Sequence, residues 1–352
     1  MTTYTRLPEE ERTIFIGLDI HCRQWHITVR DHYQERFSGS IEGSWASLEL
    51  LLSRFSGAEI RVAYEAGFSG YWLHDALQSY GAECLVVPPS LLPVEYGNHV
   101  KTDKRDSRKL AYLLSKGMLK RVWVPSEELR YHRQVFRRRR QLVQDRVRVQ
   151  SRIKSELYYY GVSLKFRPGR WTGVFFEQLK RIRFCDRWQA ASFSQLLDQY
   201  TSLEGQIASQ TRLLTELSQT ERYRHQVPLL CSMPGIGLIS AMEVLLELGD
   251  VGRFRRGDQL AAYVGLTPSQ YSSGDNVRMG RITGIGKCHL RGTLVEASWT
   301  LIRKDLGMRR IYDRLKQRAG GKRAIVAIAR RALICLRCIL LENRPYQYQA
   351  VG

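Results

Sequence analysis

Short apolar runs alternate with polar turns in the N-terminal part of the chain and predict an α/β arrangement. We expect strands at residues 14–20, 25–31, 36–41, 60–65 and 84–87, and helices from Ser44 to about residue 55, over 70–80 and from Asp103 onward. This order gives three strands, then helix and strand twice, and then a helix. It predicts one sheet with an antiparallel entry and parallel strands after it.

Helical periodicity replaces the strand pattern after Ser126. Residues 127–160 and 192–224 are both compatible with long helices, and the segment 161–173 between them contains Gly and Pro. An apolar stripe at helical spacing marks the second stretch, formed by Leu196, Leu197, Tyr200, Leu203, Ile207, Leu213, Leu214 and Leu217. Two long helices joined by such a turn predict an antiparallel hairpin.

The C-terminal third opens with a Pro-Gly-Ile-Gly turn at residues 234–237, ahead of an apolar helix. This pattern is similar to the hairpin of helix-hairpin-helix modules, where backbone N–H groups bind phosphate oxygens. An ordinary corner between two helices explains it nearly as well. A helix over 259–264, a loop over 268–274 and helical structure over 301–344 follow.

The charge of the chain favours a nucleic-acid partner. Lys and Arg outnumber Asp and Glu by 55 to 34, giving a net charge of +21. Two segments supply most of this excess: residues 121–170, with fourteen basic against four acidic residues, and residues 301–344, with thirteen against three. The first contains Arg137, Arg138, Arg139 and Arg140 and interleaved aromatic residues, which suits a phosphate backbone with stacked bases, although charge runs are often only solvated faces.

Cysteine usage and hydropathy indicate where the protein works. Seven scattered cysteines do not form a disulfide pattern, and the Cys335–Cys338 pair lies in an apolar helical stretch without a second pair. We read those two residues as core. Neither a secretory signal nor an apolar run of about 18 residues is visible, so no membrane role is expected. These features predict a reduced, cytoplasmic setting, and we expect a prokaryotic, nucleoid-associated protein.

Acidic residues at three of the predicted elements suggest a metal site. Asp103 and Asp106 share one face of a first helical turn and stand among Lys101, Lys104 and Arg105. Asp19 lies one residue before the end of the first strand, and Glu65 ends the fourth. Because strand ends and a helix start can converge at the mouth of an α/β sheet, these carboxylates suit a divalent cation acting on a phosphate. Acids are also favoured at any helix start, so the pair has a purely structural explanation.

A second candidate for chemistry is the sequence Ser272-Ser273-Gly274. Arg278, Arg281 and Lys287 follow it closely and can offset the charge of a phosphate placed against a serine hydroxyl. Two serines before a glycine are also common turn residues, and this segment alone would be read as a loop.

The combined motifs resemble the DEDD-type insertion-sequence transposases that act as bridge-RNA-guided serine recombinases. The resemblance covers nearly the whole length. It rests on the motifs Gly17-Leu18-Asp19, Tyr64-Glu65-Ala66, Thr102-Asp103-Lys104-Arg105-Asp106, Met233-Pro234-Gly235-Ile236-Gly237, Tyr263-Val264-Gly265-Leu266-Thr267-Pro268, Ser272-Ser273-Gly274 and Gly280-Arg281-Ile282-Thr283. A polar N-terminal extension before Ile14 departs from the pattern and has no assigned role.

The resemblance implies a fold and a set of site residues. It implies an RNase H-like (RuvC-like) α/β domain over 1–125, a basic helical coiled-coil insertion over 126–225, and a mainly α-helical transposase domain over 226–352. Four acids would bind Mg²⁺, and the serine before the glycine would be the nucleophile, with Ser272 beside it as the alternative. These residues are Asp19, Glu65, Asp103, Asp106 and Ser273.

The implied function is recombination of a mobile insertion sequence. A structured non-coding bridge RNA would select donor and target DNA, and a phosphoserine link to DNA would form. The expected nucleic-acid contacts are Arg137, Arg138, Arg139, Arg140, Lys104, Arg105, Arg278, Arg281 and Lys287. We expect a homo-oligomer, a dimer or tetramer, with active sites that are shared between chains. The alternatives are a Holliday-junction endonuclease that uses the acids without the serine, and a non-catalytic nucleic-acid scaffold.

Overall fold

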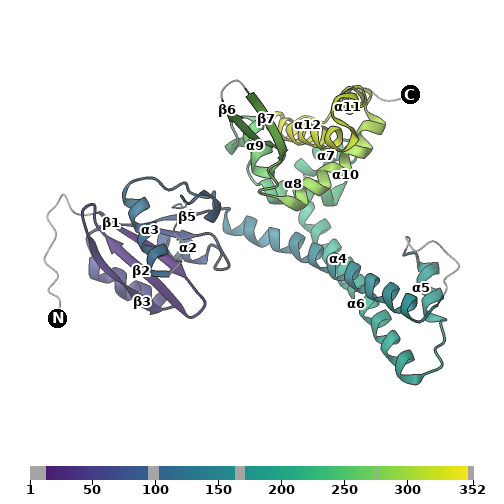
Figure 1. Cartoon of the computed structure of the whole chain (residues 1–352), viewed down its shortest axis with the longest axis horizontal. Helices are drawn as coiled ribbons and strands as arrows, with labels where there is room; N and C mark the ends of the chain where they lie inside the picture. The colour runs from purple at the N-terminus through teal and green to yellow at the C-terminus, as the bar shows by residue number, and fades with distance from the viewer. Residues whose placement is uncertain (1–12, 94–102, 163–170, 274–275, 348–352) are drawn as a thin grey trace. The chain divides into compact units, whose positions relative to one another are not determined.

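The computed structural model describes residues 13–93, 103–162, 171–273 and 276–347 (Figure 1). For Asp103 and for residues 271–273 and 276–279 it describes the backbone alone. The chain forms two compact units, Met1–Val124 and Pro125–Gly352, and each is considered by itself.

A five-stranded mixed sheet forms the centre of the first unit. Its order is β3-β2-β1-β4-β5, in which β1 pairs antiparallel with β2 and parallel with β4. The strands are β1 Thr13–Ile20, β2 Gln24–Arg30, β3 Glu35–Glu42, β4 Glu59–Glu65 and β5 Glu83–Val87. Since β2 and β3 pair antiparallel and β4 and β5 parallel, the predicted antiparallel entry and parallel continuation are confirmed.

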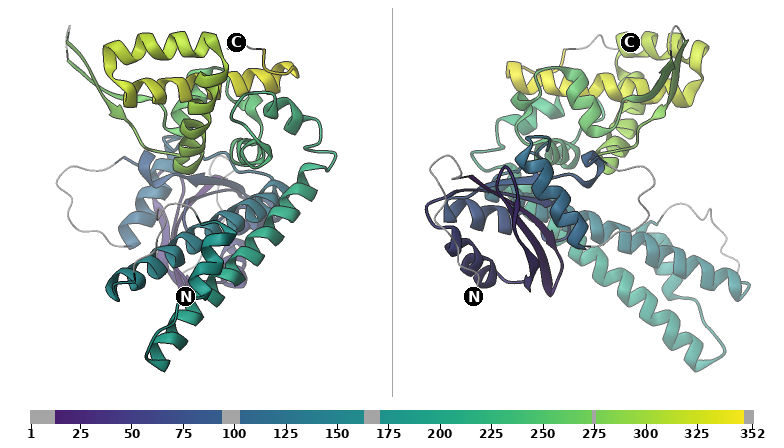
Figure 2. Two further views of the ribbon diagram at one scale, coloured as in Figure 1. Left: turned by 90° about the vertical axis from the view of Figure 1, so that its right-hand side faces the viewer. Right: turned by 60° about the vertical axis from the view of Figure 1, so that its left-hand side comes forward.

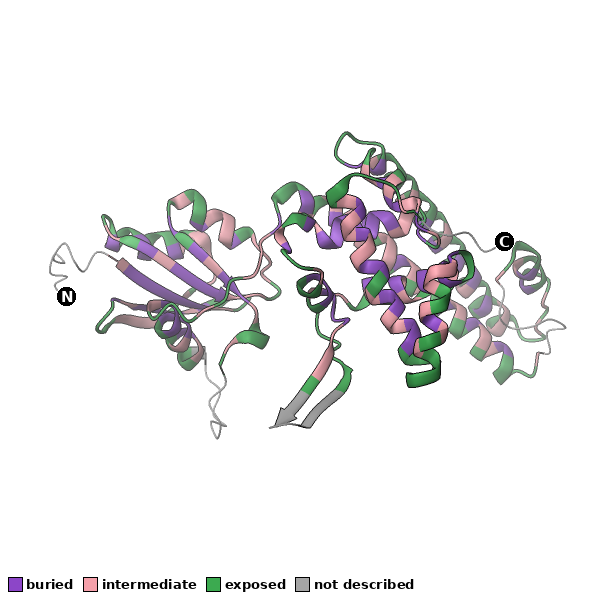
Figure 3. Ribbon diagram, turned by 90° about the horizontal axis from the view of Figure 1, so that it is seen from above, coloured by how far each residue is buried: buried purple, intermediate pink, exposed green. Residues whose placement is uncertain are grey.

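Helices cover the two faces of this sheet. The helices α1 Trp45–Leu52 and α2 Trp72–Tyr80 pack with one set of alternating strand residues, which includes Ile16 and Tyr64. Helix α3, Asp103–Ser115, packs on the other face, where Leu114 contacts a cluster containing Phe15. The short 3-10 turns η2 Ser53–Phe55 and η3 Pro89–Leu91 complete the unit. Seen from above, buried residues line the strands of the sheet (Figure 3).

Glycine at position 17 allows α3 to approach β1 closely. A Cβ atom built there would lie 2.1 Å from the Ser107 carbonyl oxygen and 2.5 Å from the Ala111 nitrogen. Both are backbone atoms of α3 and cannot rotate away as a flexible side chain can. The glycine therefore fixes the distance between the helix and the sheet.

Gly17→Ala is expected to destabilise the first unit by roughly 3 kcal/mol, because overpacking against backbone forces the helix off the sheet. Thermal denaturation of the full chain, followed by tryptophan fluorescence, measures this loss. Gly67→Ala is the matched control, since Gly67 is exposed and a Cβ there has only the Glu65 carbonyl oxygen at 3.9 Å. Equal melting temperatures for the two variants would contradict the close approach.

Two long helices side by side open the second unit (Figure 2). They are α4 Glu127–Tyr159 and α6 Arg187–Ser218, and the short helix α5 Gly173–Lys180 lies between them in sequence. Arg146 binds Glu204 at 2.8 Å and Arg139 binds Thr211 at 2.8 Å, so residues later in α4 meet residues earlier in α6. The pairing is antiparallel, as periodicity predicts. Helix α6 begins earlier than expected because Asp186 caps it, accepting from the Trp188 and Gln189 amides.

Helices also dominate the rest of the second unit. They are α7 Gln226–Cys231, α8 Leu238–Leu248, α9 Gly257–Val264, α10 Cys288–Lys304, α11 Leu306–Ala319 and α12 Gly321–Glu342, with the 3-10 turn η4 Val251–Arg253. Gly235 in the turn before α8 has φ +92°, and a Cβ there would lie 2.4 Å from the Ala297 carbonyl oxygen. That turn therefore has a packing reason for its glycine. Among the described helices, none is long and apolar enough to cross a membrane.

A β-hairpin replaces the loop expected over residues 268–274. Strand β6, Pro268–Ser273, pairs antiparallel with β7, Asn276–Ile282, and Ser273 lies opposite Asn276. Reading the serines as turn residues was wrong, because backbone pairing with β7 places both of them in a strand. The sequence held part of the evidence for these strands, since Tyr271, Val277 and Ile282 are residue types that favour strands.

Candidate active site

Two acids lie at the carboxyl ends of the neighbouring strands β1 and β4. Gly17 is opposite Ala63 and Leu18 is opposite Tyr64 in the parallel register, so Asp19 and Glu65 occupy the next positions. Leu18 and Tyr64 belong to the core beneath α1 and α2. Because side chains alternate along a strand, Asp19 and Glu65 lie on the opposite face, and both are half-buried.

The start of α3 lies on that same face. Ser107 is level with Gly17, whereas Leu114 packs with Phe15, so α3 runs away from the carboxyl end of β1. Its first turn, which carries Asp103 and Asp106, therefore lies toward the end where Asp19 is found. Asp106 is half-buried, and the side chain of Asp103 is outside the described residues.

Hydrogen bonds tie α3 to the strand next to β1. The buried Ser107 hydroxyl lies 2.9 Å from Thr28 Oγ1 and 2.9 Å from His26 Nδ1. His26 is directly opposite Asp19 in the antiparallel register, and His21 Nε2 lies 3.4 Å from Asp19 Oδ2. The sequence interpretation missed both histidines and Ser107. His26 and Thr28 are two residues apart in a predicted strand, so the sequence already indicated that their side chains lie on one face.

The carboxylates suit a divalent cation by chemistry. Asp and Glu oxygens are hard donors of the kind that Mg²⁺ and Mn²⁺ prefer. Among the side chains that the structure describes, a set without Asp103, no three His, Cys, Asp or Glu residues gather closely enough to bind a metal ion. The strands and α3 bring Asp19, Glu65 and Asp106 to one region of one face, and the four-acid site stays a prediction.

The hairpin of β6 and β7, which carries Ser272 and Ser273 and is called the serine hairpin below, is joined to a segment of the second unit that several contacts hold in place. Arg291 donates from Nη1 to the Val264 carbonyl at 2.8 Å and from Nη2 to the Gly284 carbonyl at 3.0 Å. Gly265, with φ +80°, leaves no room for a side chain, since a Cβ would lie 2.0 Å from the Ile285 carbonyl oxygen. These contacts fix residues 283–287, which follow β7. The nucleophilic role of Ser273 stays a prediction, because only its backbone is described.

The basic residues expected to bind nucleic acid have different environments. Lys104, Arg105, Arg138 and Arg281 are exposed, while the side chain of Arg278 is outside the described residues. Arg139 donates to Thr211 at 2.8 Å. Arg137 and Lys287 both bind Glu247, and Arg140 is half-buried nearby. Their nucleic-acid contacts stay predictions.

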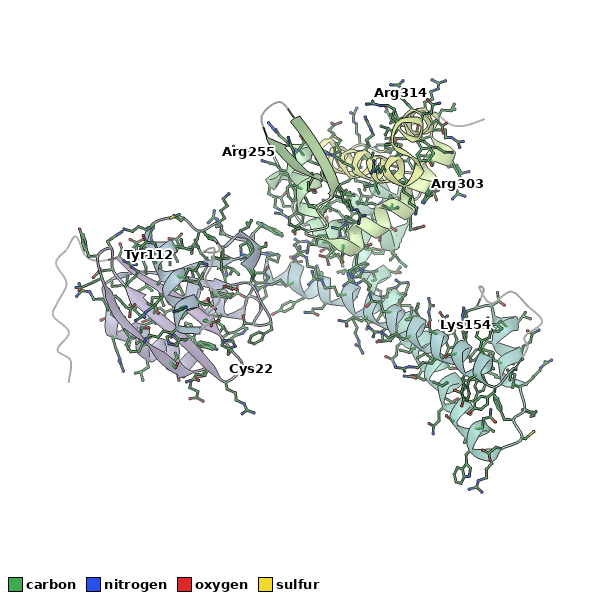
Figure 4. The ribbon with its side chains drawn as sticks, viewed as in Figure 1. Cys22, Tyr112, Lys154, Arg255, Arg303 and Arg314 are labelled. Atoms are coloured by element: carbon green, nitrogen blue, oxygen red, sulfur yellow. The ribbon has the colours of Figure 1, made fainter. Side chains whose placement is uncertain are left out.

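Exposed cations also cover the C-terminal helices. Figure 4 shows the labelled Arg303 and Arg314 among them. The exposed Lys and Arg side chains of this region are Arg303, Lys304, Arg309, Arg310, Arg314, Lys316, Arg318, Lys322, Arg323 and Arg331. Arg309 pairs with Asp313 at 3.0 Å, yet acids are scarce here, and the surface keeps a strong positive charge.

Two buried glutamates on α8 have opposite pKa shifts. Burial alone would raise the pKa of Glu247, but hydrogen bonds from Arg137 and Lys287 outweigh it and bring the pKa to about 2. Burial raises the pKa of Glu243, which accepts a 2.6 Å hydrogen bond from the Thr293 hydroxyl. Glu247 therefore holds two cations in the folded protein, and Glu243 does not.

Glu247→Gln is expected to destabilise the second unit by about 3 kcal/mol at pH 7. A depressed pKa gives stability that is complete above the unfolded value near pH 4.5 and is lost as pH falls toward 2. The variant should lose this acid dependence in denaturant unfolding. Glu243→Gln is the control and should be neutral or stabilising at pH 7, because its carboxylate is the disfavoured form in the folded protein. Similar losses in both variants would contradict the assignment.

Comparison with known proteins shows that two transposase family models match this chain. A family model described as "Transposase IS116/IS110/IS902 family" matches residues 227–313, and a DEDD transposase model of IS110 matches residues 16–161. The second range contains the four candidate acids, and the first contains Ser273.

Full-length relatives agree with these matches. The protein y4rJ of Sinorhizobium fredii, named as a transposase, is 30% identical over 92% of this chain and 90% of its own. Its counterpart y4qE from the same organism is 29% identical over 92% of this chain and 81% of its own. The transposase for insertion sequence element IS1533 of Leptospira borgpetersenii is 25% identical over 93% of this chain and 95% of its own.

Proposed function

This chain belongs to the IS116/IS110/IS902 family of transposases, and from that premise we propose that it recombines donor and target DNA under the guidance of a bridge RNA. Transposition of an insertion sequence requires DNA strands to be cut and joined. We infer that cutting uses four acids of the first unit and a serine of the second. Three parts, 1–125, 126–225 and 226–352, would divide these tasks among a RuvC-like domain, a coiled-coil insertion and a transposase domain.

One observation carries the proposal: Asp19 and Glu65 share a face of the sheet with the start of α3. The parallel register of β1 and β4 runs to Leu18 and Tyr64, so Asp19 and Glu65 come next on the two strands, and Gly17 lets α3 approach the same face. A mixed sheet with three antiparallel and then two parallel strands is also the arrangement that an RNase H-like domain requires.

We propose that Asp19, Glu65, Asp103 and Asp106 hold divalent cations, specifically Mg²⁺. When bound, the metal supplies Lewis-acid polarisation of the scissile phosphate. Three residues outside this set, Ser107, Thr28 and His26, would help to position one of the acids. Ser107 is bonded to Thr28 and His26, and these bonds fix the rotation of α3 and hence the direction in which Asp106 points.

Ser273 is the proposed nucleophile. Its oxygen would form a bond to phosphorus while the bond from phosphorus to the 3′-oxygen breaks, and the serine proton would pass to that leaving oxygen to give a 3′-hydroxyl. The phosphoserine link keeps the energy of the phosphodiester for rejoining, whereas water as nucleophile would lose it. The rigid base of the hairpin at residues 283–287 supports a defined position for Ser273. Because acids and serine lie in different units, we propose that a dimer or tetramer completes each site.

A Holliday-junction endonuclease is the second candidate, because the same acids can activate water without the serine. It predicts metal-dependent cleavage without a protein–DNA adduct. A non-catalytic scaffold predicts binding without cleavage. Incubating the chain with its co-purified RNA, Mg²⁺ and DNA of both ends separates the three, since only the serine recombinase yields a covalent adduct and joined strands.

The bridge RNA is tested by sequencing the RNA that co-purifies with the protein. The exposed Arg138 and Arg152 of α4 and the exposed cations of α11 and α12 support such a partner. We expect enrichment of one structured transcript from the DNA that flanks the gene. Recovery of bulk cellular RNA without such enrichment would remove the RNA-guided part of the proposal and leave the DNA transposase.

A further inference from the structure

A basic pocket lies between α4 and the start of α10, within the second unit. Its volume is about 220 Å³, and Arg137, Arg140, Glu247 and residues 286–290 line it. Lys287, the N-cap residue of α10, and His289 in the first turn of that helix are therefore part of its wall. Arg137, Arg140 and Lys287 are among the residues expected to contact nucleic acid, and the pocket brings them together with Glu247.

Positive charge exceeds negative charge in this pocket. Glu247 accepts two hydrogen bonds from Arg137, at 2.9 and 3.0 Å, and one from Lys287 Nζ at 2.7 Å. One carboxylate thus serves two cations, and Arg140 adds a third positive charge. Glu243 lies near enough to Arg140 for that arginine to lower its pKa, so at most two negative charges oppose three positive ones.

Arg140 is the cation with unused hydrogen-bonding capacity. Its Nε is buried without a hydrogen-bond partner among the described residues, so the terminal nitrogens of the guanidinium, and not Nε, would contact an anion in the pocket. Arg137 and Lys287, by contrast, are held in place by Glu247. Fixed cations lose little side-chain freedom when an anion arrives, which favours binding of a compact, multiply accepting anion such as a phosphate.

The surrounding backbone links this pocket to the serine hairpin. Residues 283–287 run from the end of β7 to the pocket, and Arg291 holds the Gly284 carbonyl. A Cβ on Gly286, at φ +95°, would lie 2.2 Å from the Tyr263 carbonyl oxygen, so this segment is also packed on the end of α9. A group bound in the pocket is therefore held at a fixed distance along the chain from the base of the hairpin.

We propose that this pocket binds one backbone phosphate of the DNA strand on which the hairpin acts, with Arg140 as the principal contact and Lys287 beside it. The inference rests on the proposed function, in that the hairpin is taken to act on DNA. Its effect is to hold the strand at a second point, away from the scissile phosphate, and so to set the register of the strand against Ser273.

The test is a phosphate-neutralisation scan. The full chain carrying Ser273→Ala binds DNA duplexes of its own ends in which one methylphosphonate replaces one phosphate at each position in turn. One position should weaken binding by about tenfold with Arg140 intact, because a charge-assisted contact is lost. In the Arg140→Gln variant a methylphosphonate at the same position should weaken binding no further. The slope of log K against log salt concentration should also become shallower by about 0.9.

Matched variants separate a specific contact from a loss of charge. Arg138→Gln removes an exposed arginine from the same helix and should leave the sensitivity to that position unchanged. Arg140→Lys should keep most of the salt slope. No sensitive position, a position equally sensitive with and without Arg140, or sensitivity only in RNA would overturn the inference. Because binding requires no cleavage, absence of a serine adduct would defeat the proposed function and leave this result intact.

Discussion

Asp19→Asn will abolish DNA cleavage while nucleic-acid binding persists. The amide keeps the size of the side chain but removes the anionic oxygen that a divalent cation needs, and several kcal/mol of charge stabilisation, roughly a thousandfold or more in rate, is lost with it. Glu65→Gln, Asp103→Asn and Asp106→Asn should behave alike. Cleavage of labelled DNA with Mg²⁺, measured beside binding, reports both properties.

Glu59 supplies the matched control on the same strand as Glu65. It lies at the other end of β4, is bonded to Arg61 at 2.7 Å and is exposed. Glu59→Gln should therefore cleave at the normal rate. Any one of the four acid variants that cleaves fully would be removed from the site, and the loss of cleavage in Glu59→Gln would point to a general loss of structure.

Ser273→Ala will bind DNA and RNA normally but will form no covalent protein–DNA adduct. A methyl group cannot attack phosphorus, and the loss is therefore complete. Ser272→Ala should be much milder, because consecutive residues of an extended strand face opposite sides and only one can face the phosphate. Denaturing gel electrophoresis of the reaction with labelled DNA shows the adduct as a shifted band. Survival of that band in Ser273→Ala would exclude the assignment.

Local signals explain why much of the first unit follows from the sequence. Strand and helix periods are properties of a short window, and the predicted helix start at Ser44 is confirmed by the Ser44 hydroxyl, which accepts a hydrogen bond from the Ser47 amide. Asp19 near the end of a strand and Glu65 at the end of another were likewise visible without tertiary information. Their common face follows from the parallel pairing of β1 with β4, which the order of elements predicts.

Long-range partners explain what the sequence could not provide. Nothing local pairs Arg137 with Glu247, which is 110 positions away, so a run of four arginines looked like one uniform surface. The link from Ser107 to Thr28 and His26 likewise depends on how α3 lies on the sheet. The hairpin of β6 and β7 required the pairing partner, since serines in isolation favour turns.

Mapping the covalent adduct is the most direct test of a serine recombinase. The protein is incubated with its RNA, Mg²⁺ and DNA from the element's ends, digested with nuclease and protease, and analysed by mass spectrometry for a peptide bearing a nucleotide. A phosphodiester link from Ser273 to DNA is the predicted result. Metal-dependent cleavage with no modified peptide, or a nucleotide attached to Ser272, would contradict it.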